Sequence, residues 1–436
     1  MAPRFSGRDA VAACALALAL TGGAIAIGGS GGEQGSAPAA VAPAAPLQGL
    51  GTRTLDAGVR ALQAHLRAQP KDDAGWANLG TAYVEQARTR GDPSRYAEAD
   101  RALARSLELR PGGNDAALAG RAALAAARHD FTGALHDARR ALAVNAYSER
   151  ALATRIDALV ELGRYREASR AADEADARRP GVPVFTRFSY VRELRGDIAG
   201  ARRPLEQALA GATAPGDVSY TATSLGQLAW RQGNFAEALR HCGRALRADP
   251  GHVAALECRA RARAGRGDKA GAIRDLRTVV ARYPLPGPLV ALGELYEARG
   301  DKAAAREQYG LVSAWTRLAR ANGVDVDLDT ALAAADHGDR RAALRAARAE
   351  WSRRHTVHTA DALAWALHVN GRDAEALPYA RLATRTGYRD AAFAYHRGAV
   401  ARGAERKEWL TRALRLNPEF SPVGAEAARA LSGGRP

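Results

Sequence analysis

The amino-acid sequence predicts an all-α fold, a solenoid of stacked helix-turn-helix units, and two observations carry this prediction. The first is a phrase that recurs: the stretch "GNFAEALRHCGRALRADPGH" at 233–252 has counterparts that begin at Gly163 and Gly267. The second is the composition, in which Ala dominates and only 6% of the residues are aromatic. Self-similarity at a period of about 34 residues is typical of helical pairs that each pack only against their neighbours.

The second helix of each unit is predicted from the columns of this recurring phrase. A bulky residue stands two positions after the Gly, Ala follows three positions later, and Pro closes the phrase. The aligned residues are Tyr165, Phe235 and Lys269; Ala168, Ala238 and Ala272; and Pro180, Pro250 and Pro284. Because the residue before a Pro disfavours helical backbone, we expect each second helix to end just before it.

The first helix of each unit is predicted from an apolar stripe that contains a Gly. In "WANLGTAY" the stripe has the spacing i, i+3, i+4 and i+7, so its members share one face of a helix. These members are Trp76, Leu79, Gly80 and Tyr83. The Gly lets a neighbouring helix approach closely. The same Leu-Gly pair recurs at 225–226 and 292–293.

Together the two halves resemble the tetratricopeptide repeat, whose pattern is Trp-x2-Leu-Gly-x2-Tyr, then Gly, an aromatic residue, Ala and a closing Pro. The resemblance covers many units, none of which matches every position. It implies a right-handed superhelix whose first helices line a concave groove. It also implies a non-enzymatic scaffold that binds a peptide or a helix of a partner protein in that groove.

Aligned on these columns, residues 51–431 form an array of about ten units. A lone second helix that closes at Pro70 leads the array, a last helix from Pro422 caps it, and 432–436 are expected to be a disordered tail. The units cover roughly 73–111, 114–146, 149–180, 183–213, 219–250, 253–284, 286–318, 324–355, 358–388 and 391–418.

Three features interrupt the array. Pro204 lies inside the second helix of the fourth unit, where we expect it to bend or break that helix. Irregular stretches at 211–219 and 321–329 are expected breaks at which three segments of the array could flex.

The chain is strongly basic, with a formal net charge of +16 from 63 Lys and Arg against 47 Asp and Glu. Many Arg stand in the last turn of a second helix, as at Arg110, Arg178 and Arg247, where a cation complements the helix dipole. No basic run is interleaved with aromatic residues, so nucleic acid is not the expected partner. An acidic protein partner fits the charge better. The sequence carries no signal of the oligomeric state.

Residues 1–27 are predicted to be a signal peptide or a single transmembrane anchor. Arg4 and Arg8 precede an apolar stretch at 11–27, which fits export and is also just long enough to span a bilayer. The Gly/Ala/Pro-rich residues 28–50 are typical of a tether. We therefore expect a secreted protein, or one anchored to the cytoplasmic membrane by this segment alone with the array outside. A cytoplasm-facing regulator that recruits acidic partners is the alternative.

Two cysteines lie outside the leader, Cys242 and Cys258, on helices that should pack together. We interpret them as two buried small apolar side chains. A disulfide between them is the alternative interpretation if the protein is exported.

The sequence contains no P-loop and no HExxH, so we predict no enzymatic activity, no cofactor and no metal. Two groups of candidate ligands stand out: Asp325, Asp327 and Asp329, and, in and just before the ninth unit, His355, His358, Asp361 and His368. The first group lacks the Gly and the distal Glu of a calcium loop. The second is too widely spaced to ligate one ion. A metal-handling or enzymatic role for the ninth unit is a second alternative.

The resemblance to tetratricopeptide repeats implies which side chains face the groove. The candidates are Tyr190 and Glu193 in the fourth unit; Tyr220, Thr223, Gln227 and Trp230 in the fifth; Arg261 in the sixth; Glu294 in the seventh; and Asp361, Trp365 and His368 in the ninth. Tyr, Trp and Arg often anchor interfaces. We expect Ala at Trp230 or Trp365 to weaken partner binding without unfolding the array. The alternative is that both Trp side chains serve helix packing.

Overall fold

The computed structural model describes residues 52–90 and 94–433, in which every regular element is a helix. This confirms the predicted all-α fold. The expected leader at 1–27, the tether at 28–50 and the end of the expected tail at 434–436 lie outside the described residues. Within the part of the chain that is described, no helix is both long enough and apolar enough to span a bilayer.

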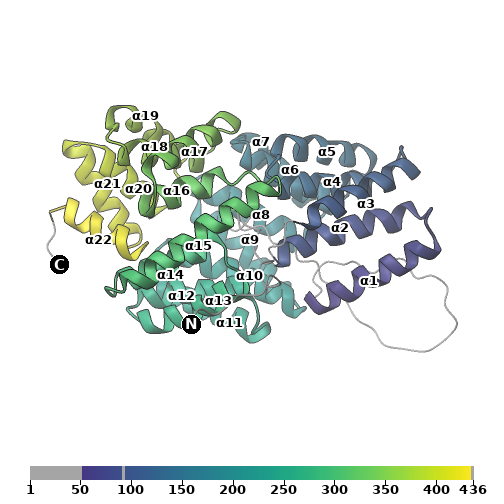
Figure 1. The fold of residues 1–436 in the computed structure, drawn as a ribbon, viewed down its shortest axis with the longest axis horizontal. Coiled ribbons are helices and arrows are strands. Elements are labelled where there is room, and N and C mark those ends of the chain that lie inside the picture. The colour runs from purple at the N-terminus through teal and green to yellow at the C-terminus, as the bar shows by residue number, and fades with distance from the viewer. Residues whose placement is uncertain (1–51, 91–93, 434–436) are drawn as a thin grey trace, which may run out of the picture.

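The helices pair along the chain into ten units, with a single helix before the first pair and another after the last (Figure 1). The single helices are α1 (Thr52–Ala68) and α22 (Pro422–Leu431). The pairs are α2 (Asp73–Arg90) and α3 (Arg95–Leu109); α4 (Asp115–Ala127) and α5 (Phe131–Val144); α6 (Glu149–Glu161) and α7 (Tyr165–Arg178); α8 (Val182–Glu193) and α9 (Ile198–Gly211); α10 (Pro215–Arg231) and α11 (Phe235–Ala248); α12 (Val253–Gly265) and α13 (Lys269–Arg282); α14 (Pro286–Glu297) and α15 (Lys302–Ala321); α16 (Asp327–His337) and α17 (Arg340–Arg353); α18 (Val357–Val369) and α19 (Asp373–Ala383); and α20 (Ala391–Val400) and α21 (Gly403–Leu416). We number these pairs units 1 to 10.

Pro204, which was expected to bend or break its helix, does not break it. Helix α9 runs through it without interruption. Pro204 is the seventh residue of α9, so the missing N–H removes a single bond near the start of the helix. Asp197 caps that start, because its carboxylate accepts a hydrogen bond of 2.8 Å from the backbone N–H of Gly200. Burial of Pro204 and Leu205 holds the helix in place.

Most units turn between their two helices through a residue with positive φ, two positions before the second helix. We call this segment the internal turn. The residues are His129, Gly163, Gly196, Gly233, Gly267, Gly300 and Gly371, with φ between 64° and 85°. Gly adopts this conformation without steric cost, which explains why the recurring phrase begins with Gly.

Close helix packing explains the Gly of the Leu-Gly pair. A Cβ on Gly226 would lie 2.7 Å from the sulfur atoms of Cys242 and Cys258, so no larger residue fits.

Cys242 and Cys258 are almost fully buried and form a disulfide with a Cα–Cα distance of 6.0 Å. The interpretation as two separate apolar side chains is therefore wrong, and the disulfide joins α11 of unit 5 to α12 of unit 6.

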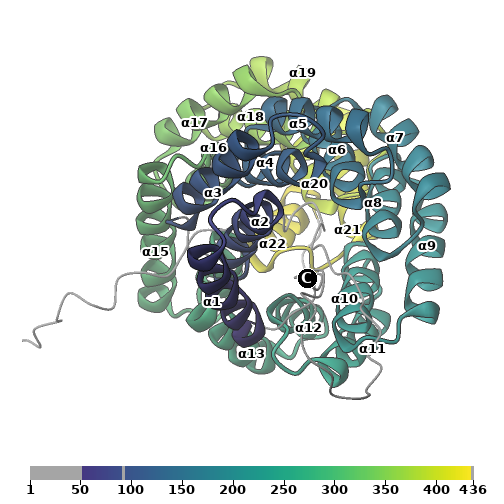
Figure 2. The ribbon, with the colours of Figure 1, turned by 90° about the vertical axis from the view of Figure 1, so that its right-hand side faces the viewer.

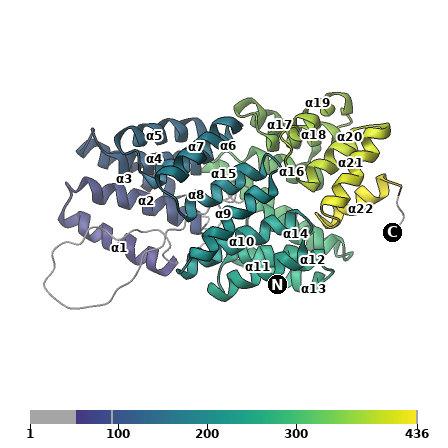
Figure 3. The same ribbon diagram turned by 180° about the vertical axis from the view of Figure 1, so that it is seen from behind.

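The ten units wind into a right-handed superhelix with two layers. Viewed along the long axis, the first helix of each unit lies on the inside and the second helix on the outside, as α8 and α10 lie within α9 and α11 (Figure 2). The winding continues past one full turn, so that the second turn follows the first along the axis (Figure 3). The first helices thus form a continuous inner surface.

The two turns of the superhelix touch along a seam with a regular register. In units 2 to 5 the internal turn of unit n, with the helix residues beside it, meets the loop that follows unit n+5; in unit 1 the C-terminal part of α2 meets the loop that follows unit 6. In units 1, 2, 3 and 5 the contacts are Tyr283 Oη to the carbonyl of Arg88 (2.5 Å), His129 Nδ1 to the carbonyl of Asp325, the N–H of Val357 to Tyr165 Oη (2.8 Å) and Asn417 Nδ2 to the carbonyl of Trp230 (2.8 Å). In unit 4, Gly196 packs directly on the backbone of Gly387.

Apolar side chains and a buried ion pair reinforce this seam. One hydrophobic cluster contains residues of helices α1, α2 and α3 together with Trp315, Val324 and Val326 of the second turn. A second cluster contains residues of the helices from α4 through α8 together with residues of α18, α19 and α20. Between them, the guanidinium of Arg354 pairs with Glu161 of the first turn and Glu350 of its own helix. The two turns therefore share one core.

Candidate interaction surface

Three of the predicted groove residues come together in a small cleft on the inner surface of units 4 and 5. Its walls are α8 and α10, and Leu205 of α9 lies at its base. The lining residues are Thr186, Ser189, Tyr190, Glu193, Leu205, Ser224, Gln227, Leu228 and Arg231. Tyr190, Glu193 and Gln227 were expected there from the sequence, and most of the other lining side chains are polar.

A buried ion pair forms one end of the cleft. Glu193 is only 2% exposed and accepts two hydrogen bonds from Arg231, at 2.5 Å from Nε and 2.8 Å from Nη2. Burial alone would lower the pKa of Arg231, but the Glu193 carboxylate outweighs it and raises that pKa. The two parallel hydrogen bonds fix the positions of both side chains, so this end of the cleft is rigid and charged.

Tyr190 brings an unsatisfied hydroxyl to the same cleft. Its Oη is buried and has no hydrogen-bond partner among the described residues. Burial also raises the pKa of Tyr190 well above its usual value, so the hydroxyl stays protonated at neutral pH. A buried hydroxyl without a partner costs free energy. A ligand group that accepted its hydrogen bond would recover that cost.

Tyr220 and Thr223 of α10 lie on the same helix as Gln227 but are buried. The hydroxyl of Thr223 donates to the carbonyl of Ser219 at 2.7 Å. Burial raises the pKa of Tyr220, although the nearby Arg187 lowers it in part. These two side chains therefore support α10 from within the inner layer.

Trp230 and Arg261 form a second contact on the inner layer, one helical turn beyond Gln227. The guanidinium of Arg261 lies 5.4 Å from the centre of the Trp230 ring and also pairs with Glu257 at 2.8 Å. The indole Nε1 of Trp230 is buried without a hydrogen-bond partner among the described residues. Trp230 is partly buried against Ala229 and Ala262, so it serves both packing and the surface.

Glu294 of α14 lies apart from this cleft and bonds to the C-terminal part of the array. Its carboxylate accepts from Ser421 Oγ at 2.8 Å and lies 3.4 Å from His337 Nε2. It therefore fastens the loop before α22 to unit 7.

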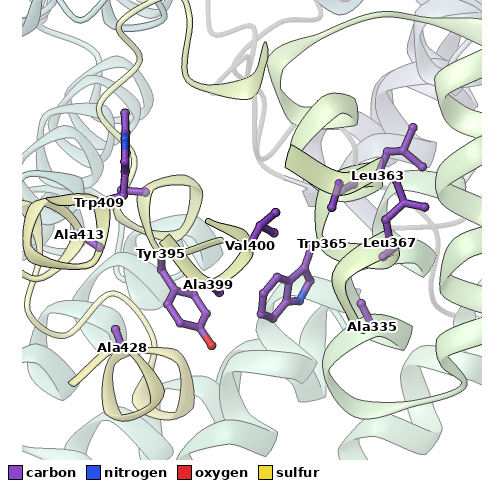
Figure 4. Close-up of a cluster of buried hydrophobic side chains, with 14 of the residues drawn as sticks. Ala335, Leu363, Trp365, Leu367, Tyr395, Ala399, Val400, Trp409, Ala413 and Ala428 are labelled. Atoms are coloured by element: carbon purple, nitrogen blue, oxygen red, sulfur yellow. The ribbon is translucent and has the colours of Figure 1, made fainter. Parts of the chain in front are cut away.

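The candidates of unit 9 are engaged in the core of the C-terminal units. Trp365 is 7% exposed, donates from Nε1 to Asp336 at 2.6 Å and stacks on His396 with ring centres 4.2 Å apart. Tyr395 packs beside it (Figure 4). Asp361, 2% exposed, bonds to His396 Nδ1 at 2.9 Å.

His368, the third candidate of unit 9, lies closer to the surface and bonds to Asp373 at 2.7 Å. Because Trp365 fills the core, the expectation that Trp365→Ala leaves the array folded does not fit its position. The three candidate side chains of unit 9 therefore do not line the cleft of units 4 and 5.

Sequence reasoning missed Arg231, Ser189 and Ser224 as parts of the cleft, whereas the repeat pattern also places Thr186 on the groove. Arg231 stands four residues after Gln227, on the same face of α10, so helical spacing could have found it. The small hydroxyl side chains carry no comparable signal, because Ser and Thr in a helix are common for other reasons.

Neither group of candidate metal ligands gathers around a single point. Within 52–90 and 94–433, no three His, Cys, Asp or Glu side chains lie close enough to hold one metal ion. Asp327 instead pairs with Arg353 and Arg320, each at 2.7 Å.

One stretch of the chain matches a known family model. Residues 221–252 match the tetratricopeptide repeat, and this stretch is the helix pair of unit 5 that carries Gln227 and Trp230. No curated protein matches the chain.

Among solved structures, the chain is similar to a tetratricopeptide repeat protein from Parabacteroides merdae (16% identity, 52% of this chain and 91% of that chain, TM-score 0.41). It is also similar to the TPR protein TTC0263 of Thermus thermophilus (21% identity, 44% and 98%, TM-score 0.38). A third similarity is to human IFIT1, solved as a dimer with PPP-AAAA (13% identity, 76% and 87%, TM-score 0.44). The family match is confined to residues 221–252, and the other units have the same helix-pair arrangement as this stretch.

Proposed function

We propose that this protein is a non-enzymatic scaffold that binds a peptide or a helix of a partner protein on the inner surface of units 4 to 6. The fold supports a protein-interaction role in general. The cleft between α8 and α10 supports this specific location.

The observation that carries the proposal is a cleft lined mostly by polar side chains, together with two donors that have no hydrogen-bond partner among the described residues. Tyr190 and Gln227 both line this cleft, and the hydroxyl of Tyr190 is buried without a partner. Trp230 adds an aromatic face and an unpaired N–H one turn away. A backbone carbonyl or an acidic side chain of a bound peptide could accept from both donors. Acidic peptides also suit the net charge of +16.

The test uses a library of random linear peptides displayed on phage, selected on the purified full-length protein. We expect an enriched peptide to lose affinity at least about tenfold with Trp230→Ala or Tyr190→Phe, as for side chains that anchor an interface. Leu311→Glu on the outer helix α15 is the control, because Leu311 is 44% exposed and far from the cleft in the fold. If peptides bind equally to all four proteins, the assignment of the inner surface is wrong.

We also propose that the array is exported, either secreted or tethered outside the cytoplasmic membrane through the N-terminal segment. The disulfide between Cys242 and Cys258 supports this, since disulfides persist mainly in oxidising compartments. Protease treatment of cells that carry a C-terminal tag tests it, after selective permeabilisation of any outer envelope layer. Loss of the tag while a cytoplasmic control survives is the expected result. A tag that stays protected would favour the cytoplasm-facing regulator instead.

A further inference from the structure

One border of the molecule exposes cations without acidic neighbours. It is formed by α11 and α13, the outer helices of units 5 and 6, and α12 packs against both. The two helices lie along the lower border of the fold in all three views (Figure 1, Figure 2, Figure 3). We call their exposed cations the cationic face. Its members are Arg240, Arg244 and Arg247 of α11 and Lys269, Arg274, Arg277 and Arg282 of α13.

The positions of these cations follow from the helix period and from the repeat. On α11, Arg240, Arg244 and Arg247 have the spacing i, i+4 and i+7, so they form one stripe. Arg274 stands 34 residues after Arg240, at the same position of the next unit. Because equivalent helices of neighbouring units are related by a small rotation, the stripes of α11 and α13 point to the same side of the molecule.

The two acidic residues of α11 and α13 are already paired with cations outside the cationic face. Glu237 is partly buried and pairs with Arg202 of α9 at 2.5 Å. Asp275 is buried and pairs with Arg259 and Arg263 of α12, at 2.8 Å and 2.7 Å. None of the seven cations of the face pairs with a carboxylate of the described residues. The face is therefore positive over its whole area.

Exposed cations also gather on α17, but carboxylates accompany them there. Arg341, Arg345 and Arg348 are exposed on this outer helix. Arg345 lies 3.7 Å from Asp339, and Glu375 is exposed on the neighbouring α19. α17 lies at the upper border of the fold, opposite to α11 and α13 (Figure 1, Figure 3). It therefore offers a matched control for the cationic face.

Two kinds of partner do not fit the other exposed residues of α11 and α13. These residues are Ala236, Ala270, Thr278 and Ala281. None of the large apolar side chains that are exposed in the described residues lies on either helix. A protein partner needs aromatic or other large side chains as anchors at the centre of an interface. A single-stranded nucleic acid needs aromatic side chains on which its bases stack.

The shape of this border favours a flat partner over a nucleic-acid duplex. The outer layer of the superhelix is convex there (Figure 2). A flat surface meets a convex one along a band, whereas a duplex is itself a convex cylinder and meets it over a smaller area. Six of the seven cations are Arg, whose guanidinium donates two parallel hydrogen bonds to a phosphate.

We infer that the cationic face binds the phosphate headgroups of an anionic lipid bilayer, with α11 and α13 lying against its surface. The contact is electrostatic, because the face has no large apolar side chain to insert between the lipids. Each cation close to an anionic bilayer strengthens binding about fivefold. Salt screens this attraction, so the affinity falls as the ionic strength rises.

The first experiment measures co-sedimentation of the full-length protein with vesicles of phosphatidylglycerol or of phosphatidylcholine. The wild-type protein should bind the anionic vesicles at least about tenfold more strongly, and added salt should reduce this preference. An apolar N-terminal segment would add equally to both affinities, so the ratio between them measures the electrostatic part. A triple variant with Arg240→Gln, Arg244→Gln and Arg274→Gln should bind the anionic vesicles at least about tenfold more weakly than the wild type.

The control is the triple variant Arg341→Gln, Arg345→Gln and Arg348→Gln, which removes the same charge from α17. It should bind within about twofold of the wild type, because screening limits the attraction to charges close to the bilayer. Equal losses in both triple variants, or a wild-type protein without preference for anionic lipid, would overturn the inference. Both variants are also tested with a labelled DNA duplex. If the α11–α13 variant loses duplex binding but keeps lipid binding, the face belongs to a nucleic-acid site instead.

The second experiment tests which side of the molecule lies on the bilayer. In a Cys14→Ser background, a fluorophore is attached to Thr278→Cys on α13 or to Ser352→Cys on α17, both exposed positions. Anionic vesicles that carry a nitroxide on their headgroups should quench the label on α13 and not the label on α17. Equal quenching at both positions would mean that the protein has no fixed orientation and would contradict the proposal. Circular dichroism melts show that each variant is folded.

Discussion

At the scale of single residues, Arg354 has the largest predicted effect on stability. Its side chain is 5% exposed and pairs with Glu161 and Glu350, which are themselves buried. Arg354→Met removes the cation and leaves two buried carboxylates without it. The free energy of unfolding should fall by about 3–5 kcal/mol.

Urea denaturation of the two proteins measures this effect. Arg345→Met is the control, because Arg345 is 71% exposed and lies 3.7 Å from Asp339. That change should stay within about 0.5 kcal/mol of the wild type. Equal losses in both variants would mean that the buried ion pair contributes nothing specific to the seam.

His358 gives the protein a predictable pH dependence. Burial, and then the positive charge of Arg354, lower the pKa of His358 to about 4, while an unfolded His titrates near 6.5. Between these values the unfolded chain binds the proton more readily, so stability falls as the pH drops from 6.5 toward 4. His358→Gln removes this proton uptake, and its unfolding free energy should fall less between pH 7 and pH 5.

The slope of stability against pH checks this prediction, with His136→Gln at an exposed position of α5 as the control. The control should keep the wild-type slope. A His358→Gln protein with an unchanged slope would show that another group governs the pH response.

Sequence reasoning placed some cleft residues well and others poorly for one physical reason. The position of a residue in the repeat predicts the direction of its side chain, and Tyr190, Glu193 and Gln227, which the family resemblance placed on the groove, line the cleft between α8 and α10. It does not predict how deeply that side chain is buried. Trp365 has the same position in its unit as Gln227, yet it is buried by Asp336, His396 and Tyr395, which come from neighbouring helices.

At the scale of elements, local patterns determined most of the helices. The Gly at most internal turns and the closing Pro mark where helices begin and end, because both act through the backbone of the residue itself. Tertiary contacts overrode the pattern where the prediction failed. α9 continues through Pro204, and α15 extends to Ala321, three residues past the expected unit, where Trp315 and Ala319 pack into the first turn.

At the scale of the whole molecule, the seam could not be predicted from the sequence. Whether unit n reaches the loop after unit n+5 depends on a small rotation at each unit interface, summed over five units. The residues at these contacts, such as His355, Gly387 and Asn417, belong to loops without a recurring pattern.

The seam also affects the expected break at 321–329. Val324 and Val326 are buried across the seam there, so flexing at this point would first have to separate the turns.

A pair of glycines measures what the seam contributes to stability. Gly196 and Gly300 have the same place in their units and nearly the same φ, 75° and 81°. Ala at either position costs about 1–2 kcal/mol for the left-handed backbone. Ala at Gly196 also forces a Cβ to within 2.4 Å of the Gly387 carbonyl, whereas nothing lies near Gly300.

Gly196→Ala should therefore lower the free energy of unfolding by about 1–3 kcal/mol more than Gly300→Ala, the cost of overpacking a close contact. Chemical denaturation gives the free energy of unfolding of each variant. The cost of Ala in left-handed backbone is the same in both, so it cancels in the difference between them. Amide hydrogen exchange shows where the loss occurs: protection should fall in α9 and in the loop before α20, although these segments are far apart in sequence. Equal losses in both variants, with exchange faster only near the substituted residue, would mean that the two turns do not hold each other.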